Sequence, residues 1–99
     1  MRKGGYIYIL SNKTNTALYV GVTSNLEQRI LQHRTGKFPN AFTSKYNITK
    51  LVYYEEFLSI EDAILREKQL KGGSRQKKID LIQKRNPEWN ELYNTGYLT

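Results

Sequence analysis

Hydrophobic and polar positions follow two different periods along the chain. Tyr, Ile, Val and Leu are concentrated in short runs with the composition of β-strands, at residues 6–10, 18–22 and 50–57. Elsewhere apolar residues recur three or four positions apart, as in amphipathic helices, at about residues 25–35, 60–71 and 75–85. The pattern predicts the order β-β-α-β-α-α. We therefore expect an α+β fold with a three-stranded, mainly antiparallel sheet flanked by helices.

Short polar residues mark the predicted helix starts. Ser24-Asn25-Leu26-Glu27 has capping-box spacing, with a small polar cap at Ser24 and a Glu three residues later. Ser59 and Ser74 are the expected caps of the later helices. The expected stops are Gly36, Gly72-Gly73 and Asn86-Pro87. Residues 36–49 are expected to form an irregular connection with a helical turn near Phe42.

The strands are expected to be covered on both faces. In the first strand Tyr6, Tyr8 and Leu10 share one face, and the other face is also apolar. On the second strand Tyr19 shares a face with Gly21, which lets another group approach the backbone closely. An antiparallel hairpin of suitable register would therefore place Tyr8 near Tyr19.

Composition limits the classes of protein that this chain can belong to. Its 99 residues suffice for one domain, which we place at 1–99, with a core at about 6–85 and a tail at 86–99 that packs back through Trp89, Leu92 and Tyr93. The chain has no Cys, which excludes disulfides and thiolate zinc sites. No apolar run approaches the roughly 20 residues of a membrane helix, and no signal-peptide core is present. A cytoplasmic protein without a membrane partner is expected.

The net charge of +7 favours a polyanionic partner. Half of the sixteen Lys and Arg residues lie within residues 66–85. A solvated basic face is the simpler interpretation of such a segment, but this density favours contact with DNA or RNA. The candidate nucleic-acid-binding residues are Lys68, Lys71, Arg75, Lys77 and Lys78.

Three polar positions are candidates for chemistry. Arg29 and His33, the only His, are four residues apart, so they share a helix face that is either solvated or able to serve phosphate chemistry. Glu67 interrupts the apolar stripe of the second long helix. It is either an edge residue paired with Arg66 or Lys71, or a metal ligand directed towards a cleft. A lone carboxylate suits Mg²⁺ or Mn²⁺, which keep several waters and bind substrate phosphates.

Taken together, these residues resemble the GIY-YIG nuclease family. Tyr6-Ile7-Tyr8 and Tyr19-Val20-Gly21 resemble its two signature elements, with Tyr6 in place of the first Gly. Arg29 and His33 match its following helix, and Ala63, Glu67 and Leu70 match the later helix that carries its metal-binding Glu. The chain is most similar to small stand-alone bacterial members, which are similar to the nuclease domain of branched-DNA endonucleases. The Asn that larger members carry after that helix has no clear counterpart, since Asn86 lies too far along the chain.

The resemblance implies a metal-dependent endonuclease that hydrolyses phosphodiester bonds in DNA, structure-selective or weakly sequence-specific. It implies that Glu67 binds Mg²⁺ or Mn²⁺, that Arg29 holds a phosphate oxygen, and that His33 hydrogen-bonds a Tyr or relays its proton. Either Tyr8 or Tyr19 would orient or deprotonate the attacking water. The alternatives are a non-catalytic nucleic-acid-binding module of the same fold, an enzyme that a partner protein completes or targets, and a protein-interaction domain with incidental positive charge.

Overall fold

The structure is a computed structural model that describes residues 4–35, 42–94 and 97–98. Its main elements are β1 (Gly5–Ser11), β2 (Leu18–Thr23), α1 (Leu26–Arg34), α2 (Phe42–Lys45), β3 (Lys50–Phe57), α3 (Ile60–Gly72) and α4 (Arg75–Arg85). Two short strands follow, β4 (Tyr93–Asn94) and β5 (Tyr97–Leu98). The predicted order β-β-α-β-α-α is confirmed, and α2 is the helical turn expected near Phe42. The pairing of β4 with β5 was not predicted.

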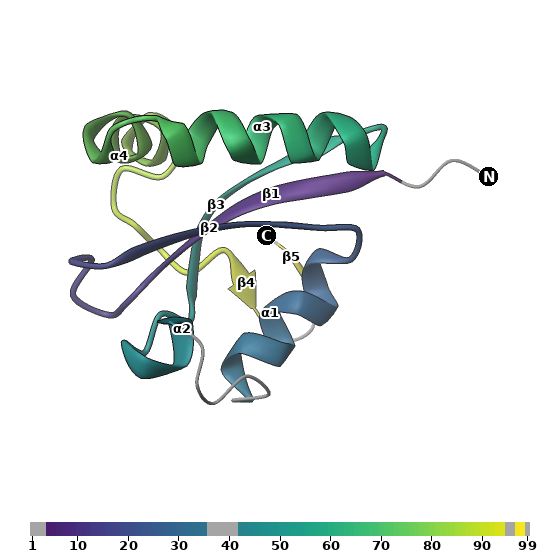
Figure 1. Cartoon of the computed structure of the whole chain (residues 1–99). Helices are drawn as coiled ribbons and strands as arrows, with labels where there is room; N and C mark the ends of the chain where they lie inside the picture. The colour runs from purple at the N-terminus through teal and green to yellow at the C-terminus, as the bar shows by residue number, and fades with distance from the viewer. Residues whose placement is uncertain (1–3, 36–41, 95–96, 99) are drawn as a thin grey trace.

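The main sheet has the strand order β2-β1-β3, with both pairings antiparallel. Helices α3 and α4 lie over one face of it, and α1 lies on the other side (Figure 1). Strand β1 is central, and β2 is an edge strand. Among the described residues, no helix is long and apolar enough to cross a membrane.

Both faces of β1 are buried, as its sequence predicts. Ile7 and Ile9 belong to one apolar cluster, which α3 and α4 complete with Leu70 and Ile82. Tyr8 belongs to a second cluster with Leu10, Leu26, Ile30, Ile48, Leu51 and Tyr93. Because the sheet is covered on both sides, side chains of β1 can build different environments on its two faces.

The first helix begins one residue later than its capping pattern suggested. Asn25, rather than Ser24, is the N-cap, and its side chain accepts a hydrogen bond from the backbone N–H of Gln28. The Thr23 hydroxyl accepts a hydrogen bond from the Asn25 backbone N–H at 3.1 Å, which holds the cap in place. The predicted caps Ser59 and Ser74 are confirmed.

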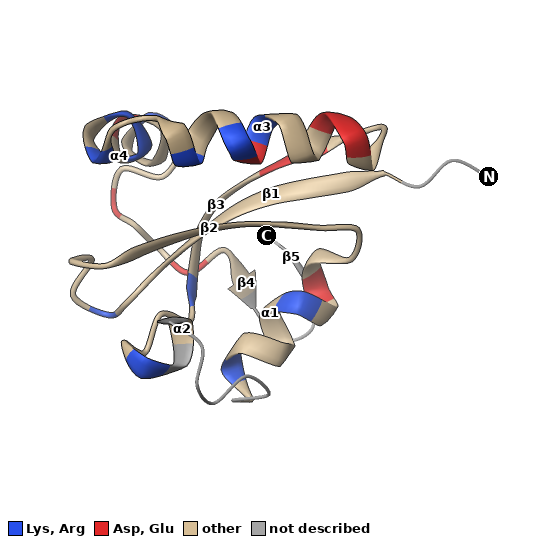
Figure 2. Cartoon of the chain, viewed as in Figure 1, with Lys and Arg blue, Asp and Glu red and all other residues tan. Residues whose placement is uncertain are grey.

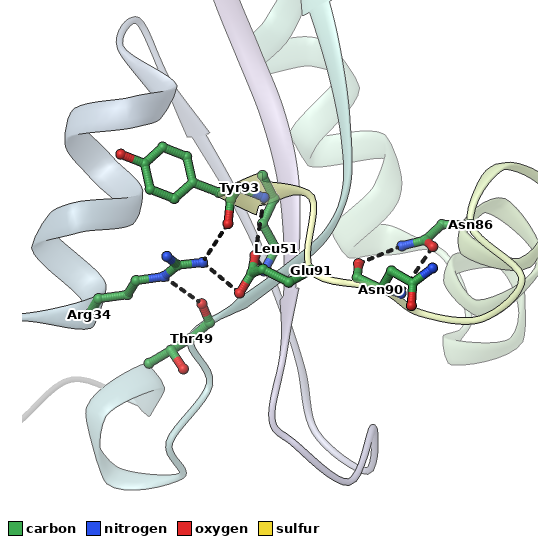
Figure 3. Close-up of polar contacts among 7 residues, drawn as sticks. All are labelled: Arg34, Thr49, Leu51, Asn86, Asn90, Glu91 and Tyr93. Atoms are coloured by element: carbon green, nitrogen blue, oxygen red, sulfur yellow. Dashed lines mark hydrogen bonds and ion pairs between the residues drawn. The ribbon is translucent and has the colours of Figure 1, made fainter. Parts of the chain in front are cut away.

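The C-terminal tail packs back onto the domain, as expected. Tyr93 is buried, and Trp89 and Leu92 pack against the two apolar clusters. Polar contacts hold the tail as well (Figure 3). Arg34 of α1 forms an ion pair with Glu91, and Glu91 in turn accepts a hydrogen bond from the backbone N–H of Leu51 at 2.9 Å. The tail is thereby joined to α1 and to β3.

Candidate active site

The candidate site is built around Tyr8, whose ring packs against β2 at Gly21. Tyr8 on β1 lies opposite Gly21 on β2. A Cβ atom at Gly21 would lie 2.3 Å from the Tyr8 hydroxyl, so only glycine leaves room for the ring. Strand β2 is an edge strand, and Gly21 therefore allows the Tyr8 hydroxyl to reach the edge of the sheet.

The buried side chain of His33 meets Tyr8 from α1. The Tyr8 hydroxyl lies 3.2 Å from His33 Nε2, and His33 Nδ1 lies 2.9 Å from the hydroxyl of Thr43 on α2. If Nδ1 carries the proton and donates to Thr43, Nε2 accepts from the Tyr8 hydroxyl. Sequence reasoning missed Thr43, because a Thr in an irregular segment carries no recognisable signal.

Tyr19 completes an aromatic group around this histidine. Its ring centroid is 6.3 Å from that of Tyr8 and 5.7 Å from that of His33. Tyr19 is only half-buried, whereas Tyr8 is fully buried. The expectation that the two Tyr residues lie near each other is therefore met, and they differ in their access to solvent.

Arg29 acts electrostatically on the same pair of side chains. Burial raises the pKa of Tyr8 well above its usual range, and the charge and hydrogen bonding of Arg29 work in the opposite direction. Burial lowers the pKa of His33, and the positive charge of Arg29 lowers it further. At neutral pH the site therefore contains a neutral imidazole, a neutral Tyr8 phenol and a permanent guanidinium cation.

Glu67 lies on α3, which covers the face of the sheet opposite α1 (Figure 1). Its side chain is 14% exposed, and its Oε2 lies 2.9 Å from Lys71 Nζ. Burial and Tyr19 raise the pKa of Tyr8, and the negative charge of Glu67 makes a smaller contribution in the same direction. The interpretation of Glu67 as a residue paired with Lys71 is therefore confirmed, and its role as a metal ligand stays a prediction.

Glu67 is chemically suited to a hard divalent cation. Mg²⁺ is often bound by one or two carboxylates, with water and substrate phosphate oxygens as its other ligands. Within the part of the chain that the structure describes, no group of three or more His, Cys, Asp and Glu residues could hold a metal ion. The donor set therefore fits a cation shared between Glu67 and a bound phosphate, and it does not fit a metal site built from protein ligands alone.

Positive charge gathers on α4 and the C-terminal part of α3 (Figure 2). The structure separates the five candidate nucleic-acid-binding residues. Lys71, Arg75 and Lys78 line a surface depression of about 250 Å³ together with Leu18, Tyr19 and Val20. Lys77 instead lines a groove between α3 and α4, and Lys68 is exposed on α3. The depression beside Tyr19 is therefore the basic surface adjacent to the candidate site.

The side chain of Asn86 bonds to the backbone of β3 and of the tail. Its side-chain amide donates to the backbone carbonyls of Val52 at 3.0 Å and Asn90 at 2.9 Å. Its carbonyl oxygen accepts from the backbone N–H of Asn90 at 3.0 Å. These bonds join the end of α4 to β3 and the tail, so Asn86 does not substitute for a downstream Asn in the site.

Comparison with known proteins agrees with this geometry. Residues 4–80 match the model of the GIY-YIG catalytic domain. The chain belongs to the GIY-YIG family. The match includes β1, β2, α1 and α3, the elements that supply the candidate site.

Small relatives of similar length exist in several organisms. A UPF0213 protein of Syntrophus aciditrophicus is 41% identical over 83 residues, which cover 84% of this chain and 93% of the relative. A UPF0213 protein of Staphylococcus haemolyticus is 42% identical over 84 residues, covering 81% and 95%. The solution NMR structure of a UPF0213 protein from Bacillus halodurans, 31% identical, superposes with a TM-score of 0.56 over 89% of this chain and 92% of that one.

Proposed function

We propose that this GIY-YIG protein is a divalent-metal-dependent endonuclease that hydrolyses phosphodiester bonds in DNA. One observation carries the proposal. The Tyr8 hydroxyl packs against Gly21 and lies 3.2 Å from the imidazole of His33, and the charges of Arg29 and Glu67 both act on it. Three elements, β1, α1 and α3, supply these groups, and β2 supplies Gly21. Family membership supports the same reaction class.

Arg29 and Glu67 have complementary roles in this proposal. The planar guanidinium of Arg29 holds a non-bridging phosphate oxygen as negative charge develops there. Glu67 is the residue that would hold Mg²⁺ or Mn²⁺, and the ion supplies Lewis-acid stabilisation of the phosphate oxygens when bound.

The two Tyr residues receive different roles because their exposure differs. Tyr19 borders the basic depression, so its hydroxyl is the one that we assign to orienting the attacking water. Tyr8 is fully buried against His33, and burial raises its pKa. We therefore assign Tyr8 a positioning role. Its hydroxyl hydrogen-bonds His33, and His33 in turn hydrogen-bonds Thr43, which fixes the orientation of the hydroxyl.

The proposed substrate contact is made to backbone phosphates. Lys71, Arg75 and Lys78 lie side by side at the depression, where they can neutralise phosphates without reading bases. This favours a structure-selective or weakly sequence-specific enzyme acting on DNA, with RNA as a further substrate to test. If several phosphates are contacted, affinity should fall with a log–log salt slope of roughly −0.7 to −0.9 per contact.

A cleavage assay tests the proposal. Labelled single-stranded, duplex and branched DNA, and matched RNA, are incubated with the protein in Mg²⁺, Mn²⁺ or chelator. Metal-dependent cleavage is expected, with loss in Glu67→Gln, which keeps the shape of the side chain but removes its charge. Glu88→Gln, a change at an exposed tail residue, is the matched control and should cleave like the wild type.

Two results would contradict the proposal that this site cleaves DNA without a partner. Salt-sensitive binding of every substrate without cleavage in either metal would indicate the binding module or an enzyme completed by a partner. Cleavage that survives Glu67→Gln would show that the activity does not come from this site.

A further inference from the structure

The ion pair between Glu67 and Lys71 places a cation on the only carboxylate that we assign to the site. Lys71 Nζ lies 2.9 Å from Glu67 Oε2. The same ammonium lies 5.9 Å from the ring centroid of Tyr19. Lys71 also lines the depression that contains Arg75 and Lys78. One side chain therefore touches both the proposed metal ligand and the proposed phosphate surface.

The two partners of the pair differ in their freedom to move. The Lys71 side chain is 51% exposed, whereas that of Glu67 is 14% exposed. A half-exposed Lys keeps much of its hydration and rotamer freedom, so leaving the pair requires little free energy. Glu67 is the more buried of the two, so Lys71 is the partner that can change position more easily.

A helix-stabilising pair is the simplest alternative interpretation. A Glu four residues before a Lys is the favourable orientation for such a pair on a helix. That interpretation explains the contact between the two residues, but it does not account for the position of Lys71 above Tyr19 and beside Arg75 and Lys78. It also predicts that removing Lys71 changes helix stability without changing metal affinity specifically.

We infer that Lys71 competes with the divalent cation for Glu67 and moves to the substrate phosphate when the cation binds. The inference rests on the proposed function, since it takes Glu67 as the metal ligand. The carboxylate oxygen cannot bind the ammonium and the metal ion in the same position, so binding of one weakens binding of the other. Lys71 thereby lowers metal affinity in the absence of nucleic acid and raises nucleic-acid affinity.

The two effects have opposite signs, which makes the inference testable with Lys71→Met. Mg²⁺ is titrated into ¹⁵N-labelled protein without nucleic acid, and the amide shifts of residues 63–71 give the dissociation constant. Lys71→Met should bind Mg²⁺ about two- to fivefold more tightly, because an exposed pair contributes up to about a factor of five. Binding of labelled duplex DNA in chelator should become weaker in the same variant.

Matched variants separate competition from a general loss of positive charge. Lys68→Met removes an exposed charge from the same helix, next to Glu67 in sequence, and should leave Mg²⁺ affinity nearly unchanged. Lys71→Arg keeps a cation at the position and should behave like the wild type. Glu67→Gln should lose the Mg²⁺-dependent shifts.

The outcomes distinguish the inference from the proposed function. Glu67-dependent Mg²⁺ binding that is no tighter in Lys71→Met than in Lys68→Met overturns the competition and leaves the endonuclease intact. Mg²⁺ shifts that persist in Glu67→Gln, or their absence in the wild type, overturn the assignment of Glu67 and the competition with it.

Discussion

Two polar regions of this small domain use their hydrogen-bonding groups in different ways. At the tail, side chains bind mainly backbone groups: Arg34 donates to the carbonyls of Thr49 and Tyr93, and Asn86 donates to that of Asn90 (Figure 3). Asn86 also donates to the carbonyl of Val52. At the candidate site, side chains face other side chains. Tyr8 meets His33, His33 meets Thr43, and Glu67 meets Lys71.

Two arginines on α1 show the contrast most clearly. Arg34 pairs with Glu91 at 2.5 Å and lies 4.8 Å above the ring of Tyr93. Across the described residues, Arg29 forms no ion pair with a carboxylate, and its charge acts on Tyr8 and His33 instead. Bonds to the backbone fix the fold, whereas a cation without a bound carboxylate is available to a phosphate. We therefore expect the tail contacts to contribute mainly to stability and the side chains at the β2 edge to contribute to the proposed chemistry.

The largest combined effect, on stability and on cleavage, is expected from a substitution at Gly21. Gly21→Ala places a methyl group 2.3 Å from the buried Tyr8 hydroxyl, so the ring must move away from His33. We expect a loss of about 1–3 kcal/mol in the free energy of unfolding, as for other overpacked sites, together with loss of cleavage. Denaturant unfolding and the cleavage assay measure the two effects.

Gly72→Ala is the matched control for that change. A Cβ there meets nothing within 4 Å, so stability and cleavage should both be maintained. Equal damage from the two substitutions would show that Gly21 is not a specific opening for Tyr8.

A substitution in the tail should instead lower stability without changing cleavage. Asn86→Ala removes three hydrogen bonds and leaves the buried carbonyl of Val52 and the part-buried backbone groups of Asn90 without this partner. The expected loss is about 1–3 kcal/mol in the free energy of unfolding. Cleavage per folded molecule should stay near the wild-type rate. A variant that remained folded but no longer cleaved DNA would place Asn86 in the site and contradict the separate roles of the tail and the site.

A smaller effect is expected from pH. Burial lowers the pKa of His33, so the folded protein takes up this proton at lower pH than the unfolded chain, whose His titrates near about 6.5. The unfolded state therefore binds more protons between these two pKa values. Stability should fall as the pH drops through about 6.5 and level off below the folded pKa.

His33→Gln identifies this contribution, because His33 is the only His in the chain. The variant should lose the dependence of thermal stability on pH near pH 6, while acid unfolding at lower pH remains. Glu55 contributes only at that lower pH: burial works to raise its pKa, but hydrogen bonds from Arg66 and Tyr53 outweigh burial and lower it. An unchanged profile near pH 6 in His33→Gln would mean that the imidazole is not held neutral.

Much of the architecture follows from local pattern. Period-two and helical spacing predict the strands and long helices, because both faces of β1 and the stripes of α3 and α4 must be buried. The predicted cap at Ser24 fails because the Thr23 hydroxyl supports Asn25 instead, which is a contact that spacing alone does not reveal. The β4–β5 pair consists of two-residue strands, too short for any periodicity to indicate.

The candidate residues of the site can be picked out from the sequence, but their arrangement in space cannot. Glycine at position 21 indicates a close approach, yet only the register shows that the approaching group is Tyr8. Charge density predicts basic contacts, but helix geometry decides that Lys77 turns away from Tyr19 while Lys71 and Lys78 turn towards it. Thr43 and the tail contacts of Asn86 depend on segments far apart in sequence, so no local pattern contains them.

The most direct test compares Arg29→Gln with Arg34→Gln, measuring the DNA cleavage rate and the free energy of unfolding for each. Arg29→Gln should slow cleavage roughly 100-fold or more, as when a donor to developing negative charge is removed, with little change in stability. Arg34→Gln should lose about 1 kcal/mol of stability, because its exposed ion pair and hydrogen bonds are modest, and should cleave at the wild-type rate. Equal slowing in both variants, or lost stability with normal cleavage in Arg29→Gln, would contradict the separation between the tail and the β2 edge.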